Sequence, residues 1–456
     1  TKLIPNVRVG SHGPEADHVM LHHKIEKENG HYVYADDDPR QNSSLAFAST
    51  VNTVNSFMEI FEGDFKWAFK YDKLLVRPNT GKDFNANYRR ESGTVNFYQE
   101  LDPVRNVHVH SGASGDIVSH EVGHALLDAI RPEYFNSWGP EPAAFHESFG
   151  DIMSLHMALK DERVLDRLVQ ETGGDLSKPN LVAHMAEELG TGVNNSKGTN
   201  HTGGKYLRNA NNDFKYVDPS SLSEEKGGPE QLGWGKHSFS RVWTGAHYDL
   251  LHAMVAERME QGVDAKAALT QSNEELFRML ANMLRESPRG KFGFRDMAIA
   301  FIQSDKIHND GKRADMIQKV FTARDILPAD LPQELLEKDE VSRRSMASAR
   351  LFQSAREIEP EFESVQVKLG PGLGQFAGAI VEVPTGHDER IFKSGHLQSE
   401  TEQDISRLIQ AGKIRYNDPN YQMKHEDSYN PHGEAYAGAV VWEDGQMKIE
   451  RLHISC

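Results

Sequence analysis

Between about residues 114 and 157 the sequence predicts two helices joined by one loop, and this pair constrains the fold more than any other feature. Apolar residues recur at helical spacing on both sides of a connection rich in proline, glycine and aromatic residues, Arg131 to Pro142. Pro132 stops the first helix, because its ring blocks the preceding turn, and Pro142 can open the second. The polar side chains carried by these two helices are therefore the first candidates for a functional site.

Two histidines lie one turn apart on the first of these helices. His120 and His124 share a helix face, so both imidazoles can bind one ion. Zn²⁺ suits this geometry because it accepts neutral imidazole nitrogen and keeps a position for water when only three protein ligands are used. Glu147 on the second helix supplies the third ligand, and Asp151, one turn later, is placed to accept the free ring N–H of His120.

Glu121 follows the first histidine directly, so its side chain points beside the metal and not at it. We interpret it as a general base, which takes a proton from water activated by the metal and later passes that proton to a leaving amine. The alternative is an amphipathic helix that carries His and Glu on its surface. The Glu-x-x-x-Asp pattern of the second helix, Glu147 to Asp151, argues against that alternative.

The composition argues against several classes of partner. The net charge of -17 disfavours nucleic acid and anionic membranes, because both bind clusters of Lys and Arg. No stretch approaches the roughly 18 apolar residues of a membrane span. Cys456 is the only cysteine, so no internal disulfide can form, and a structural zinc site built on cysteines is disfavoured.

The length and the periodicity together predict the fold class. At 456 residues the chain exceeds what one hydrophobic core usually organises, which predicts two or three domains. In the first hundred residues we expect a short strand within residues 30–41, an amphipathic helix over residues 44–61 and strands near residues 73–77. Residues 158–190 and 240–330 return to helical spacing. The predicted class is α+β.

Two further stretches differ in character from the rest. Residues 195–236 are rich in Gly, Asn, Ser and Lys, which makes them a candidate functional loop region. After a charged linker over residues 334–344, glycine-broken and alternating patterns indicate a small appended domain with β content, residues 346–456. The predicted domains are therefore 1–130, 131–335 and 346–456.

These motifs resemble those of the gluzincin metallopeptidases, and of the thermolysin-like family in particular. The resemblance runs from Asn85 to Tyr248, about a third of the chain. It implies a thermolysin-like fold, with an N-terminal α+β domain that ends in the zinc helix and a mainly helical second domain that supplies the glutamate ligand. The small C-terminal domain is additional, and the resemblance implies no role for it.

The resemblance also implies where substrate binds. The stretch that begins Asn85-Ala86 is similar to the family's Asn-Ala-x-aromatic motif, so Asn85 and Ala86 would contact the peptide chain. The next strand, Gly93 to Tyr98, would be a sheet edge to which substrate adds as a further strand.

Three more residues match positions of the family that act on the reacting carbonyl. Arg208 matches an arginine that binds a substrate carbonyl beside the cut bond, and His237 matches a histidine that donates a hydrogen bond to the oxyanion. Tyr134, in the loop between the helices, is a candidate for the family's oxyanion tyrosine. One such donor is worth on the order of 3 kcal/mol.

The sequence departs from the family at two sites. Asp116 fits one position of the family's calcium clusters, but Ala158 stands where the next acidic residue is expected, so Ca²⁺ is supported only in part. Leu232 occupies the position of the carboxylate that orients the oxyanion histidine, and Glu230 is a replacement to consider.

These observations predict a zinc-dependent endopeptidase that acts on a peptide or protein substrate. An aminopeptidase or a non-peptide metal hydrolase with the same zinc centre is one alternative, although the sequence has no Gly-x-Met-Glu-Asn type stretch to hold a substrate N-terminus. A non-catalytic zinc-binding protein is another. No basic-then-apolar leader opens the sequence, and the resemblance favours secretion after processing over a cytoplasmic location. Oligomeric state is left open.

Overall fold

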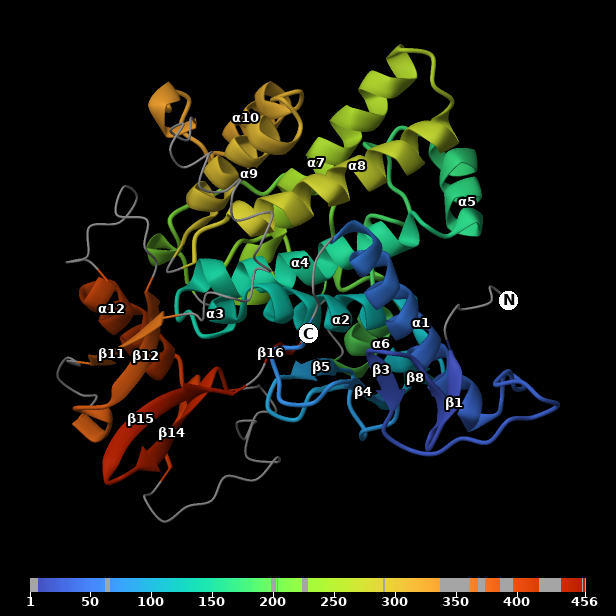
Figure 1. Ribbon diagram of the computed structural model, residues 1–456, viewed down its shortest axis with the longest axis horizontal. Coiled ribbons are helices and arrows are strands. Elements are labelled where there is room, and N and C mark those ends of the chain that lie inside the picture. Colours follow the sequence, from blue (N-terminus) through green and yellow to red (C-terminus); the bar gives the residue numbers. More distant parts are fainter. Residues whose placement is uncertain are drawn as a thin grey trace.

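Figure 1 shows the computed structural model, in which strands gather toward the two ends of the sequence and helices fill the middle. This mixture of helices and sheets is consistent with the predicted α+β class. Among the described residues no helix is both long enough and apolar enough to cross a membrane. The structure describes residues 7–61, 66–197, 202, 204–223, 229–289, 292–336, 361–367, 374–385, 397–417, 436–452 and 454–455.

The largest sheet has seven strands and lies beside the N-terminal helices (Figure 1). Two pairings, β3 (Val19–Leu21) with β4 (Leu74–Arg77) and β4 with β6 (Thr94–Phe97), are parallel, and the others are antiparallel. β7 (Gln99–Asp102) and β8 (Val107–His110) form a separate hairpin. In spatial order, the sheet's strands are β1 (Arg8–Gly10), β2 (Gly13–Glu15), β3 (Val19–Leu21), β4 (Leu74–Arg77), β6 (Thr94–Phe97), β5 (Ala86–Arg89) and β16 (Ile454–Ser455).

The strand that was predicted to be an edge lies inside this sheet. β6 pairs with β4 on one side and with β5 on the other, and all four of its residues are buried. β5, which begins at Ala86, has β6 on one side and β16 on the other. The edge prediction for residues 93–98 is therefore wrong. The pattern along one strand does not reveal which neighbours distant parts of the chain bring to it.

The long N-terminal helix, α1 (Pro39–Ile60), packs against the sheet as expected. It begins where the Asp38 carboxylate accepts a hydrogen bond of 2.8 Å from a backbone N–H of the first turn. The strand expected within residues 30–41 is absent from the structure. Asp38 starts a helix there, and the Tyr34 N–H donates to Gln41 Oε1 at 3.0 Å, which holds the segment as a loop against α1.

The predicted helix pair is present as α2 (Gly115–Ile130) and α4 (Pro140–Ala158), which pack against each other. α4 begins two residues earlier than expected, because Pro140 already takes the first helical position. α7 (Lys236–Glu260) packs on α4, and residues 173–186 interrupt the helical stretch expected over 158–190. The other α-helices described before residue 337 are α3 (Pro132–Phe135), α5 (Glu162–Thr172), α6 (Glu187–Lys197), α7 (Lys236–Glu260), α8 (Ala265–Glu286), α9 (Phe294–His308) and α10 (Ala314–Ala323).

Two glycines allow α2 and α4 to approach closely. A Cβ added to Gly123 would lie 3.0 Å from the Cα of Gly150, which is tighter than ordinary contact. A Cβ added to Gly150 would lie 2.7 Å from the imidazole ring of His120. The small size of both residues therefore brings the polar side chains of the two helices within reach of one another.

The described part of the C-terminal region forms a second unit with its own sheet and its own hydrophobic core (Figure 1). The first core continues without interruption across residue 131, where the sequence predicts a domain boundary. The second core includes Trp138 and Trp234, which come from the first part of the chain. The elements of the C-terminal unit are β11 (Glu361–Gln366), β12 (Ile380–Thr385), α12 (Leu397–Gln410), β13 (Ile414–Arg415), β14 (Gly438–Glu443) and β15 (Gln446–Arg451).

Candidate metal centre

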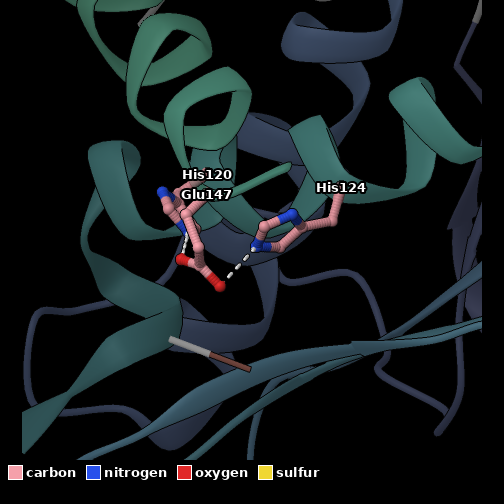
Figure 2. Close-up of side chains that lie close together, drawn as sticks. All are labelled: His120, His124 and Glu147. Atoms are coloured by element: carbon pink, nitrogen blue, oxygen red, sulfur yellow. Dashed lines mark ion pairs between the residues drawn. The ribbon is translucent and has the colours of Figure 1, made fainter. Parts of the chain in front are cut away.

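Three side chains from the helix pair converge where α2 and α4 pack together. His120 and His124 project from α2 and Glu147 from α4, and all three are buried. Figure 2 shows the carboxylate between the two rings, with Glu147 Oε2 3.3 Å from His120 Nε2 and Glu147 Oε1 3.9 Å from His124 Nε2. One donor atom from each side chain lies within 4.8 Å of the others, so the three could hold one metal ion.

The chemistry of these atoms fits a divalent metal such as Zn²⁺. Two imidazole nitrogens and one carboxylate oxygen are donors that Zn²⁺ prefers. His124 Nε2 is buried and has no hydrogen-bond partner among the described residues, an arrangement that costs free energy unless a cation satisfies it. Burial lowers the pKa of His124 well below its usual value, more than the Glu147 carboxylate raises it, which keeps the ring neutral for metal binding.

His146 is a neighbour of the centre that the sequence analysis did not single out. Its Nδ1 lies 3.4 Å from Nδ1 of His124, and burial lowers the pKa of His146 to about 3, so it is neutral. If His124 Nε2 binds a metal, its proton must sit on Nδ1 and point at His146. The only sequence signal for this contact was the position of His146 immediately before Glu147.

Asp151 lies one turn after Glu147 on α4, with its Oδ1 3.0 Å from His120 Nδ1. It accepts two hydrogen bonds of 3.0 Å from Arg208 Nε and one of 2.8 Å from Nη2. Burial alone would raise the pKa of Asp151, but Arg208 and His120 outweigh burial and lower it. The ionised carboxylate is therefore placed to hold the His120 proton on Nδ1, which leaves Nε2 facing Glu147.

Arg208, which the resemblance predicts to contact substrate, lies at the start of β10 (Arg208–Asn209). Its guanidinium donates hydrogen bonds to the Asp151 carboxylate. Its Nη2 also lies 3.4 Å from His120 Nδ1, and its side chain is only 10% exposed. The structure thus brings Arg208 to the centre, where it secures the residue that orients His120. Its contact with a substrate carbonyl stays a prediction.

The start of α7 adds two basic residues to the same carboxylate. Lys236 Nζ donates to Glu147 Oε1 at 2.7 Å, and His237 Nε2 lies 3.3 Å from the same oxygen. Burial alone would raise the pKa of Glu147, but these two neighbours outweigh it and hold the pKa well below the usual range. His237 is 42% exposed, so one side of the centre reaches solvent. Sequence reasoning missed Lys236, for which no motif gave a signal.

Glu121 is fully buried within α2, between the two histidines in sequence. Glu230, considered as a partner for His237, is exposed, and among the described contacts the carboxylate nearest to His237 belongs to Glu147. Asp116, considered for calcium, instead accepts a hydrogen bond of 2.9 Å from Ile117 N and one of 2.6 Å from Ala186 N. Among the described residues, only His120, His124 and Glu147 form a group that could hold a metal.

Tyr134 and Asn85 both form hydrogen bonds with residues other than the three candidate ligands. The Tyr134 hydroxyl donates to Pro288 O at 2.7 Å and lies 2.7 Å from Ser287 Oγ, and burial raises its pKa. No described contact joins it to the three candidate ligands. Asn85 Oδ1 accepts a hydrogen bond of 2.8 Å from Ala86 N, which positions the start of β5.

Comparison with known proteins assigns no family to this chain. No protein-family model matches its sequence, and no curated protein matches it significantly.

Proposed function

We propose that the protein is a zinc-dependent endopeptidase of the gluzincin type with a thermolysin-like catalytic region. The observation that carries the proposal is the buried group of His120, His124 and Glu147, whose donor atoms lie within 4.8 Å of one another. Glu121 on the same helix and Asp151 beside His120 supply the two further carboxylates that such a centre uses.

Each residue of the centre has a distinct task in peptide hydrolysis. His120, His124 and Glu147 bind the metal, and Asp151 holds the proton of His120 at Nδ1. Bound Zn²⁺ supplies Lewis acidity, which acidifies water and polarises a carbonyl. Glu121 accepts a proton from the attacking water at its carboxylate and then donates it to the nitrogen of the leaving amine. His237, which reaches solvent, donates a hydrogen bond to the oxygen on which negative charge develops.

A peptide substrate is supported by the strand that follows Asn85. The side of β5 away from β6 accepts an extended backbone, since β16 pairs with it in antiparallel fashion. Recognition through backbone hydrogen bonds suits a substrate whose repeating unit is the peptide bond. An aminopeptidase or a non-peptide hydrolase with the same centre is the second candidate, and cleavage of an N-terminally blocked peptide decides between them.

Metal analysis combined with cleavage-site mapping tests the proposal. The purified protein should contain close to one zinc per chain and should cut a denatured protein mixture at internal bonds, and a zinc chelator should abolish the cleavage. Glu121→Gln should retain zinc while losing about 10²–10⁴-fold or more in rate, because the proton acceptor is gone. Glu162→Gln, at an exposed residue on α5, is the control. Normal cleavage by the Glu121→Gln variant would contradict the role of Glu121 as the proton acceptor.

A further inference from the structure

β16, the last strand that the structure describes, pairs with the side of β5 that faces away from β6. β16 pairs with β5 in antiparallel register, with Ile454 opposite Tyr88 and Ser455 opposite Asn87. It is the terminal strand of the seven-stranded sheet at that side. In Figure 1 it lies next to β5 and below α2.

β5 is firmly connected to the helix that carries the two histidines. The Tyr88 hydroxyl donates to Asp128 Oδ2 at 2.7 Å, and Arg90 Nε donates to the same oxygen at 2.8 Å. Asp128 lies one turn beyond His124 on α2. A strand paired with β5 is therefore joined through Asp128 to the helix that carries His120 and His124.

The C-terminal unit also packs against the segments that lead into α4 and α7. Trp138 and Trp234, each two residues before the first residue of its helix, are part of the second hydrophobic core. The Arg451 guanidinium lies 4.7 Å from the centre of the Trp138 ring and donates to Ser137 O at 2.5 Å. Arg407 lies 5.6 Å from the Trp234 ring. The C-terminal unit thus contacts the segments just before α4, which carries Glu147, and just before α7, which carries Lys236 and His237.

We propose that the C-terminal unit is an intramolecular inhibitor, whose strand β16 occupies the side of β5 that a substrate backbone would use. The inference rests on the proposed peptidase function. Three observations carry it: the antiparallel pairing with β5, the attachment of β5 to α2, and the packing of the unit on Trp138 and Trp234. A tethered strand competes at an effective concentration in the millimolar range, so weak pairing suffices to exclude a dilute substrate.

The kinetic test compares two double variants of the full chain. Ile454→Pro with Ser455→Pro removes the backbone N–H groups that β16 can donate, whereas Ile454→Ala with Ser455→Ala keeps them. Because the occupant competes with substrate, the proline variant should show a KM for a blocked peptide about tenfold lower at unchanged kcat, as expected for losing one or two hydrogen bonds. The alanine variant should match the wild type. Equal KM values in all three chains would overturn the proposal.

A binding test does not depend on catalysis. A fluorescent peptide of residues 450–455 should bind the proline variant in a Glu121→Gln background and should not bind the Glu121→Gln chain with an intact β16. Equal binding to both chains, or binding to neither, contradicts occupation of β5 by this segment. If no chain cleaves peptide but the difference in binding is present, the peptidase proposal fails while the occupied side of β5 stands. Thermal unfolding of each variant verifies that it is folded.

Discussion

Gly150 on α4 lies against the imidazole of His120 on α2, so closely that a Cβ at position 150 would be 2.7 Å from the ring. Real side-chain carbons essentially never approach so closely, so either the ring or the helix must move if a methyl group is added. The position of a candidate metal ligand is thus set by the absence of a side chain on the opposite helix.

Gly150→Ala should therefore weaken zinc binding. The displaced ring no longer presents Nε2 to the other ligands, and overpacking should lower the free energy of unfolding by about 1–3 kcal/mol. Chelator competition measures the zinc affinity, and urea titration measures the stability. Gly115→Ala is the matched control, because a Cβ at that position of α2 meets no atom within 4 Å. Equal zinc affinities in the two variants would show that the contact between Gly150 and His120 does not determine zinc binding.

Asp151→Asn should reduce zinc affinity by about 10–100-fold, because a neutral amide orients and polarises the ligating imidazole less well than a carboxylate does. It should also remove the ion pair between Asp151 and Arg208, which is 2.8 Å long in the structure. Zinc affinity by competition and unfolding of the metal-free protein are the two measurements. The control is Asp161→Asn, which changes the partly exposed aspartate that caps the start of α5 and should leave zinc affinity unchanged.

Lys236→Met should have opposite effects on the metal-bound and metal-free proteins. Lys236 donates to Glu147 Oε1 at 2.7 Å, so its charge competes with a metal for that oxygen. Its removal should tighten zinc binding several-fold and lower the stability of the metal-free protein, in which the buried carboxylate loses compensation. Lys215→Met, at an exposed ion pair with Asp325, is the control. A Lys236→Met variant with weaker zinc binding would show that the lysine supports the site and does not compete with the metal.

His156 should make the protein sensitive to acid. Its ring stacks on Phe277 at 3.9 Å and lies within hydrogen-bond distance of Ser56 and Asn273, and burial lowers its pKa to about 3. The folded state thus keeps the ring neutral, whereas the unfolded chain protonates it near pH 6.5. The stability contributed by the neutral ring is complete above pH 6.5 and is lost as the pH falls toward 3, on the order of 5 kcal/mol in all.

His156→Gln is the variant that tests this origin of the acid sensitivity. It replaces the titrating ring by an amide, so the loss of stability between pH 6.5 and pH 3 should be shallower than in the wild type. Urea unfolding at several pH values provides the slopes. Parallel slopes for the two proteins would place the acid sensitivity at other residues, such as the buried His247, whose pKa burial also lowers to about 3.

The parts of the centre that are local in sequence were accessible to prediction. The spacing of His120 and His124 places them on one helix face, and the spacing of Glu147 and Asp151 does the same on α4, so helix periodicity alone brings each pair together. The contacts that depend on distant parts of the chain were not. Lys236 reaches Glu147 from a helix that begins 89 residues later in the sequence, and the second neighbour of β5 comes from residues 454–455.

The wrong predictions have the same origin. Within residues 93–98 the sequence predicts a strand, and β6 (Thr94–Phe97) forms there, but its position inside the sheet depends on β4 and β5. Within residues 30–41 the aromatic pattern favoured a strand, but the Asp38-Pro39 step begins a helix instead. The Asp38 cap decided the outcome within residues 30–41, and the neighbours β4 and β5 decided the position of β6. Periodicity within a short stretch of sequence reveals neither a helix cap nor the strands that will pair.

β5 can pair with β16 only at the end of synthesis, after the residues of the candidate metal centre have been made. β5, α2 and α4 leave the ribosome long before residues 454–455 are made, and parts of a chain that emerge first generally fold first. During that interval the side of β5 is an unpaired strand edge, which favours pairing with other extended chains. The nascent protein therefore passes through a stage in which the candidate centre can assemble before its own β16 exists to cover that edge.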